Sequence, residues 1–85
     1  MRRLLWTRAA WEDYLWWERQ DKRIRNRINA LIDDAQRDPF SGIGKPEPLK
    51  RNLAGKWSRR ITDEHRLVYE VQDDALVIHQ CRLHY

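Results

Sequence analysis

The sequence predicts an α+β fold in which two N-terminal helices pack on one face of a twisted antiparallel β-sheet. Apolar residues recur at helical spacing through the first part of the chain, whereas from residue 57 onward they alternate with polar residues as in strands. Residues 39–48 separate the two parts and hold all three prolines and two of the three glycines, which indicates a loop. Helices followed by neighbouring strands are typical of α+β proteins.

A short opening strand over residues 3–6 precedes the first helix. Thr7 is its expected N-cap, because a threonine hydroxyl can accept a free backbone N–H of the first turn. The helical spacing extends to about Arg19, with apolar positions at Ala10, Trp11, Tyr14, Leu15 and Trp17. We expect Trp11, Tyr14 and Leu15 to be able to face the sheet.

Asp21 is the expected N-cap of a second helix, which Asp38 and Pro39 end because proline disfavours helix in the residue before it. Its apolar positions fall on one face at Ile24, Ile28, Leu31, Ile32 and Ala35. Only Gln20 and its neighbours separate the helices, so they form an antiparallel hairpin. Alternation then predicts strands over residues 57–62, 66–71 and 75 to about 82, with turns at Asp63–Glu64 and Asp73–Asp74.

The composition limits the classes of protein to consider. At 85 residues we expect one domain spanning residues 1–85, and 41% hydrophobic residues suffice for one small core. A single cysteine excludes an intrachain disulfide and fits a reducing compartment. No apolar run can span a membrane, and charged residues interrupt any export signal, so we expect a cytoplasmic protein without a membrane partner. A net charge of +4 favours a polyanionic partner.

Five tryptophans are more than so small a core needs, and Trp16 and Trp17 point about 100° apart on a helix. One of the two can cap the edge of the core. Alternatively they belong to a protein–protein surface, where tryptophan is enriched. Stacking on nucleic-acid bases ranks lowest, because the surrounding sequence has mixed charge.

Positive charge concentrates between Lys45 and Arg60, which hold six basic residues and one acid, Glu47. Cleaving RNA without a metal requires a base for the 2′-OH, an acid for the leaving 5′-oxygen and cations for the phosphate. Glu47 is the candidate base, since it is ionised at neutral pH and Pro46 and Pro48 restrain its backbone. Its alternative role is a surface ion pair with Lys45 or Lys50.

His84 is the candidate acid, because the carboxylate of Tyr85 one residue away favours the imidazolium. A histidine at a chain end is otherwise usually frayed, but here it directly follows a predicted strand. Arg60 and Arg66 flank a turn, so strand pairing brings them together, where two guanidinium groups could clamp a phosphate. Lys50 is a further candidate for a phosphate contact. Either arginine could instead pair with Asp63, Glu64 or Glu70.

The other histidines are weaker candidates, and we expect His65 in its turn to be structural. His79 shares a strand face with Val77 and Cys81, which favours a position at the edge of the core. The spacing of His79, Cys81 and His84 resembles a metal site only superficially, since alternation puts the two histidines on opposite faces and no fourth ligand is evident. We therefore expect neither a metal nor a cofactor.

Several strings of residues resemble one family. They are Lys45-Pro46-Glu47-Pro48-Leu49-Lys50, Trp57-Ser58-Arg59-Arg60-Ile61-Thr62, Glu64-His65-Arg66-Leu67-Val68-Tyr69 and the ending Cys81-Arg82-Leu83-His84-Tyr85. Together they are similar to the YoeB toxins (the Txe/YoeB family) of bacterial type II toxin–antitoxin systems. The resemblance covers essentially the whole chain.

This resemblance implies a RelE-like, microbial-ribonuclease-type fold and an endonuclease that cuts mRNA in the A site of the 70S ribosome. It also implies a homodimer, a YefM-type antitoxin partner, and contact with operator DNA only through the antitoxin complex. The family's base falls on Glu47, its acid on His84, its phosphate-stabilising arginine on Arg66 and its terminal aromatic on Tyr85, which the chemistry alone did not single out. Lys50 and Arg60 match positions that hold the RNA backbone. The alternative is a non-catalytic nucleic-acid-binding module or a toxin-derived regulator.

Overall fold

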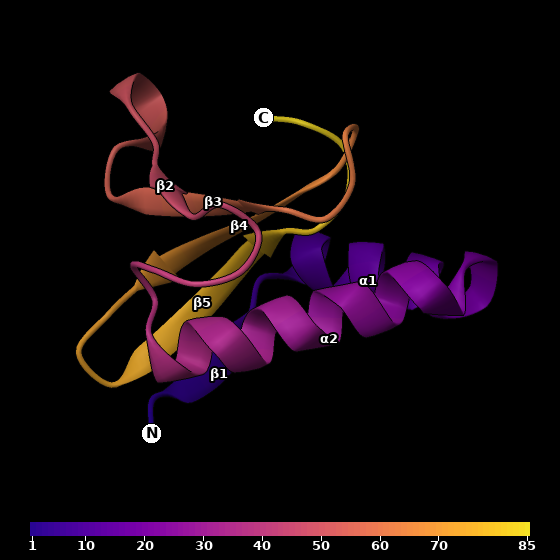
Figure 1. Ribbon diagram of the computed structural model, residues 1–85, viewed down its shortest axis with the longest axis horizontal. Helices are drawn as coiled ribbons and strands as arrows, with labels where there is room; N and C mark the ends of the chain where they lie inside the picture. The colour runs from indigo at the N-terminus through magenta and orange to yellow at the C-terminus, as the bar shows by residue number, and fades with distance from the viewer.

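The computed structural model describes all of residues 1–85, with two helices packed on one face of a five-stranded sheet (Figure 1). In chain order the elements are β1 (Arg3–Trp6), α1 (Arg8–Gln20), α2 (Lys22–Arg37), β2 (Glu47–Pro48), a 3₁₀ turn η1 (Arg51–Leu53), β3 (Lys56–Arg60), β4 (Arg66–Val71) and β5 (Ala75–Gln80). The strands lie in the order β1-β5-β4-β3-β2. The predicted α+β fold is confirmed. Neither helix is long and apolar enough to cross a bilayer.

The sheet is mixed rather than wholly antiparallel. β2 to β5 form the predicted antiparallel arrangement, but β1 pairs with β5 in parallel, with Arg3 opposite Ala75 and Trp6 opposite Ile78. A parallel pair needs a long crossover between its strands. Both helices and the rest of the sheet lie between β1 and β5 in the sequence, so no tight turn imposes an antiparallel pairing.

Both helices begin at the predicted caps. The hydroxyl of Thr7 accepts the N–H of Ala10 at 3.1 Å, and the carboxylate of Asp21 accepts the N–H groups of Arg23 and Ile24 at 3.0 and 3.3 Å. Each cap satisfies backbone donors that have no partner inside the helix. Asp21 is also the last residue of the connection from α1, which makes the helical hairpin tight.

The core lies between the helices and the sheet. Its fully buried members include Ile28 and Leu31 from α2, Leu67 from β4, and Leu76 and Ile78 from β5. Truncating a side chain such as Leu31 to alanine typically costs about 2–5 kcal/mol of stability. This cluster fixes the helix-covered face of the sheet, and no helix covers the opposite face of β3 and β4, which is called the open face below.

The tryptophans divide between the core and its edge. Trp17 is 4% exposed, and its indole N–H donates to the carbonyl of Cys81 at 2.8 Å. Trp16 is half-buried, with the guanidinium of Arg82 stacked 3.7 Å from its ring centre. Trp11 packs edge-on against Trp6 of the edge strand β1, with the ring centres 5.5 Å apart, but it remains 44% exposed. The edge-of-core role therefore fits Trp16, and the exposed indole is Trp11.

A register shift in β5 changes the side-chain faces that simple alternation predicts. Val68 lies opposite Gln80 while Tyr69 lies opposite Ile78, which leaves His79 as an extra residue. Cys81 is consequently buried in the core, while His79 pairs with Glu70 at 2.9 Å. The expectation that His79 and Cys81 share a face is therefore wrong.

Candidate active site

The candidate residues gather on the open face of the sheet. Glu47 lies opposite Ser58 in the pairing of β2 with β3, and Arg60 lies opposite Arg66 in the pairing of β3 with β4. Opposed residues of an antiparallel pair project from the same face, as do residues two apart along one strand. Arg59, between Ser58 and Arg60, points into the helix-covered side, so the other four residues share the open face.

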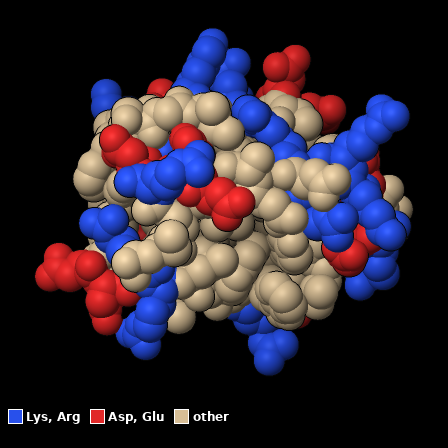
Figure 2. All heavy atoms as spheres, turned by 60° about the horizontal axis from the view of Figure 1, so that its bottom comes forward, with Lys and Arg blue, Asp and Glu red and all other residues tan.

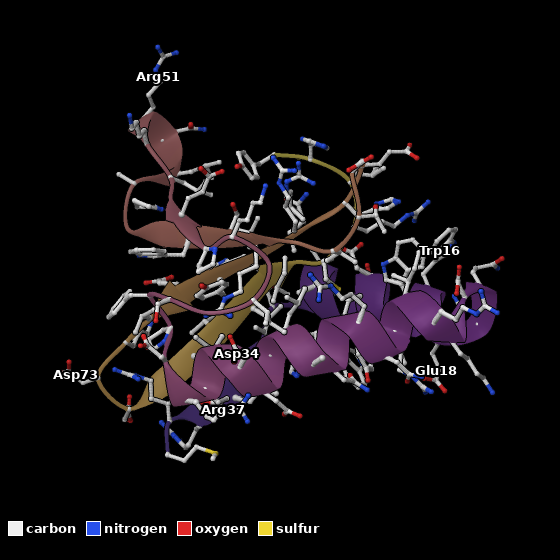
Figure 3. All side chains as sticks on the ribbon, in the orientation of Figure 1. Trp16, Glu18, Asp34, Arg37, Arg51 and Asp73 are labelled. Atoms are coloured by element: carbon white, nitrogen blue, oxygen red, sulfur yellow. The ribbon has the colours of Figure 1, made fainter.

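The segment that carries Glu47 is anchored by a fully buried arginine, Arg59. Its Nε donates to the hydroxyl of Tyr69 at 2.9 Å, and its Nη1 donates to the carboxylate of Asp34 at 2.6 Å. The two terminal nitrogens also donate to loop carbonyls at residues 38, 41 and 43, at 2.7 to 3.1 Å. Arg59 thus joins α2, β4 and the proline-rich loop, and Figure 3 shows Asp34 on α2 below that loop.

Sequence reasoning missed this role of Arg59, although a signal was present. A charged residue between Trp57 and Ile61 falls on the core side of a strand, where an arginine needs partners for its donors. The Arg59 hydrogen bond is also the main reason why the pKa of Asp34 falls to about 2; the N–H of Ile43 and the Arg37 side chain lower it further.

The loop then passes closely over Leu31 of α2 and the backbone of β3. Gly44 has φ +81°, and a Cβ there would lie 2.6 Å from a methyl of Leu31. Its carbonyl accepts the N–H of Arg60 at 2.7 Å. Only glycine combines this conformation with so close an approach. The contact places Glu47 at the edge of β3.

The Glu47 carboxylate is exposed and takes part in none of the six ion pairs. The alternative role, pairing with Lys45 or Lys50, is therefore absent from this structure. Lys50 is also exposed and precedes η1, whose Arg51 points away from the body of the molecule in Figure 3. The base candidate and the nearby cations are open to an external ligand.

The chain after β5 folds back toward the open face and is anchored by hydrogen bonds at Cys81, the first residue after the strand. Cys81 accepts the Trp17 indole N–H through its carbonyl and donates its own N–H to the carboxylate of Asp13 at 3.2 Å. Burial is the main cause that raises the pKa of Asp13. Leu83 then donates its N–H to Nδ1 of His65 at 2.8 Å, and its carbonyl accepts the N–H of Arg66 at 3.1 Å.

These contacts bring the last two residues to the open face. The hydroxyl of Tyr85 lies 3.3 Å from Oγ of Ser58, the residue opposite Glu47. Nε2 of His84 lies 3.2 Å from the carbonyl oxygen of Asp63 in the turn between β3 and β4. Side chains from β2, β3 and the C-terminal segment therefore converge from distant parts of the sequence.

Arg66 is anchored by one nitrogen only. Its Nη1 donates to the carbonyls of Thr62, Asp63 and His65 at 2.7, 3.1 and 3.1 Å. Its Nε and Nη2 make no hydrogen bond within the protein. Arg66 also forms no ion pair, and Glu70, one of its alternative partners, pairs with His79 instead. A guanidinium held by one nitrogen with two others free can still bind a phosphate through both.

The surface around these residues is open rather than enclosed. The hollows in the surface lie elsewhere, along β1, α1 and the start of the chain, with Trp6 and Trp11 lining two of them. Figure 2 shows Lys and Arg side chains gathered at the end of the molecule where α1 leads into α2, so positive charge is not confined to one face. An open, basic surface suits a polymer better than a small enclosed ligand.

Comparison with known sequences gives one consistent family. A family model described as the YoeB-like toxin of bacterial type II toxin–antitoxin systems matches residues 6–85. Toxin YoeB of Escherichia coli K12 is 61% identical over 83 residues, which is 98% of this chain and 99% of that protein.

Solved structures agree in fold and length. A YoeB/ParE toxin from Agrobacterium tumefaciens superposes with a TM-score of 0.94 at 53% identity, covering 98% of this chain and 99% of that one. A YoeB dimer from Staphylococcus aureus gives 0.92 at 44% identity, with 99% and 98% covered. A YoeB–YefM complex from the same organism gives 0.91 at 42% identity, with 100% and 99% covered.

Proposed function

Since this chain belongs to the YoeB family of toxins of bacterial type II toxin–antitoxin systems, we propose that it is an endoribonuclease that cleaves mRNA in the ribosomal A site. Cleavage there inhibits translation and growth. Residues 1–85 act as one catalytic domain. The observation that carries the proposal is the convergence of Glu47, Arg66, His84 and Tyr85 on one open, basic face.

The reaction uses two proton transfers. The Glu47 carboxylate takes the proton of the 2′-OH, and the 2′-oxygen attacks the adjacent phosphorus. The bond from phosphorus to the 5′-oxygen breaks, and the His84 imidazolium gives its proton to that oxygen. The products are a 2′,3′-cyclic phosphate and a free 5′-OH. Because Glu47 and His84 supply both transfers, the mechanism needs no metal ion.

The remaining residues bind the phosphate and the bases. Arg66 offers its free Nε and Nη2 to the phosphate as negative charge builds there, while Nη1 stays on the turn. Arg60, which lies opposite Arg66, and Lys50 contact neighbouring phosphates. Tyr85 presents an aromatic ring on which a base can stack. The net charge of +4 favours binding among ribosomal RNA.

The proposed partners follow from the S. aureus structures, which contain a YoeB dimer and a YoeB–YefM complex. We propose that this chain likewise forms a homodimer and is neutralised by a YefM-type antitoxin. It meets operator DNA only through that antitoxin complex. Because its target is the translating ribosome, its site of action is the cytoplasm.

The test is to incubate the protein with translating ribosomes and to map new mRNA ends. The wild type is expected to produce cuts that carry a 2′,3′-cyclic phosphate, and Glu47→Gln and His84→Gln lose them. Glu64→Gln, which changes an exposed turn residue nearby, is the matched control and cleaves normally. Ribosome binding without cuts by the wild type would instead identify a non-catalytic binding module.

A further inference from the structure

The turn that precedes His84 contains a leucine in an unfavourable backbone conformation. Leu83 has φ +65°, in the left-handed region that residues with a side chain rarely adopt. Its side chain is 55% exposed, so packing does not hold it there. Polar contacts to its backbone must do so.

Three groups supply those contacts. Gln80 donates from Nε2 to the carbonyls of Arg82 and Leu83 at 2.9 and 3.1 Å, and the backbone N–H of Arg66 donates to the Leu83 carbonyl. The N–H of Leu83 has one partner, Nδ1 of His65 at 2.8 Å. Since Nδ1 accepts this bond, the proton of the neutral ring resides on Nε2.

His65 is itself firmly placed. Its ring packs edge-on against the buried Trp17, with the ring centres 4.8 Å apart. Its backbone N–H donates to Oγ1 of Thr62 at 3.2 Å, and its carbonyl accepts from Ile61 at 3.0 Å. The Nδ1 atom that accepts the Leu83 N–H therefore belongs to a residue that is fixed both to the core and to the turn between β3 and β4.

We propose that His65 is a positioning residue for the acid, holding the Leu83 N–H so that His84 faces the open side of the sheet. His65 touches neither substrate nor the reacting atoms in this role. The inference rests on the proposed function of His84, but it also predicts a property of the free protein, namely a fixed C-terminal segment.

Two substitutions separate the hydrogen bond from the packing. In His65→Asn the Oδ1 atom occupies the position of Nδ1 and can accept the Leu83 N–H, but the ring is lost. In His65→Phe the ring remains against Trp17 and the acceptor is lost. We expect His65→Asn to keep kcat within about threefold of the wild type. His65→Phe is expected to lower kcat at least tenfold with KM little changed.

The same two substitutions at His79 are the control, because His79 contacts Glu70 rather than the C-terminal residues 83–85. Both His79→Asn and His79→Phe are expected to keep kcat. The inference is overturned if His65→Phe retains kcat, or if His65→Asn loses as much as His65→Phe. Thermal unfolding of each variant excludes a general loss of fold as the cause.

NMR of the free protein provides a readout that does not depend on cleavage. We expect protection of the Leu83 amide from exchange and an Nε2–H tautomer of His65 in the wild type. His65→Asn keeps the protection and low mobility of residues 83–85, and His65→Phe loses both. If the wild type cuts no RNA but shows this pattern, the proposed function of His84 fails, while the placement of the C-terminal segment by His65 holds. A mobile tail in the wild type overturns the positioning role.

Discussion

His84 and Arg66 share one hydrogen-bond acceptor, the carbonyl oxygen of Asp63, which lies 3.2 Å from Nε2 of His84 and 3.1 Å from Nη1 of Arg66. The acid and the phosphate-binding cation of the proposed reaction are thus organised by the backbone of a single turn. The carboxylate of Asp63 takes part in neither contact. This distinction between backbone and side chain leads to two separate predictions.

Arg66→Lys is expected to lower the cleavage rate by roughly 10–100-fold, although the positive charge is kept. A lysine ammonium is a single point charge, whereas the arginine binds the turn through Nη1 while Nε and Nη2 stay free. Single-turnover cleavage on ribosomes measures the effect. Arg60→Lys, at an exposed position without an ion pair, serves as the control and should lose less. Equal losses in the two variants would contradict the proposal that Arg66 binds the turn and the phosphate at the same time.

Asp63→Ala is expected to leave the cleavage rate within about twofold of the wild type. The substitution removes a carboxylate that pairs with neither Arg66 nor His84 and keeps the carbonyl that both contact. The same cleavage assay, together with thermal unfolding, tests this. A large loss of activity would show that Arg66 or His84 depends on the Asp63 side chain after all.

Substitutions at Leu83 test the conformation of the turn before His84. Leu83→Gly should keep the rate within about threefold, because glycine adopts a positive φ without strain. Leu83→Ile should lower it, since a left-handed conformation costs roughly 1–2 kcal/mol and a β-branched side chain is especially unsuited to it. Cleavage rates and amide exchange of the tail are the measurements. A higher cleavage rate for Leu83→Ile than for Leu83→Gly would refute this account of the turn.

Much of the fold was predictable because local periodicity determines it. The caps at Thr7 and Asp21 and the strand over residues 66–71 follow from neighbouring residues alone, and the structure has them where the sequence predicts. The parallel pairing of β1 could not be predicted in this way, because it joins segments about 70 residues apart. The extra residue His79 in β5 could not be predicted either, because a prediction from alternating apolar and polar residues assumes a strand pairing without bulges.

For the candidate site, the chemistry of RNA cleavage identifies the candidate catalytic residues in the sequence, but it does not identify the residues that hold them in place. Glu47 and His84 can be selected from the sequence as the candidate base and the candidate acid, because RNA cleavage requires one of each however the chain folds. The Arg59 contacts to Asp34 and the loop, and the His65 contact to Leu83, join segments that only the folded structure brings together. Long-range contacts of this kind leave little trace in one sequence.

Asp13→Asn is expected to gain stability relative to the wild type as the pH rises from about 4 toward 7. Burial raises the pKa of Asp13, so folding favours its protonated form and the ionised form weakens the folded state above that pKa. Asparagine does not titrate and can still accept the Cys81 N–H through Oδ1. Urea unfolding at several pH values measures the difference. A difference that is constant over this range would argue against a raised pKa.

Asp34 should show the opposite pH dependence. Its pKa falls to about 2 through the hydrogen bonds from Arg59, Ile43 and Arg37, so its stabilising effect is complete above the ordinary aspartate pKa of about 4. Asp34→Asn is therefore less stable than the wild type at pH 7, and the gap closes as the pH falls from about 4 to about 2. Urea unfolding across that range measures the gap.

Asp33→Asn is the matched control, because Asp33 is the exposed neighbour on α2 and forms no ion pair. Its stability at pH 7 should equal that of the wild type. Since Asp34 and Arg59 together hold the loop that leads to Glu47, Asp34→Asn should also slow RNA cleavage at neutral pH under conditions where the protein remains folded. If Asp34→Asn and Asp33→Asn proved equally stable and equally active, the buried arginine would not depend on Asp34 to fix that loop.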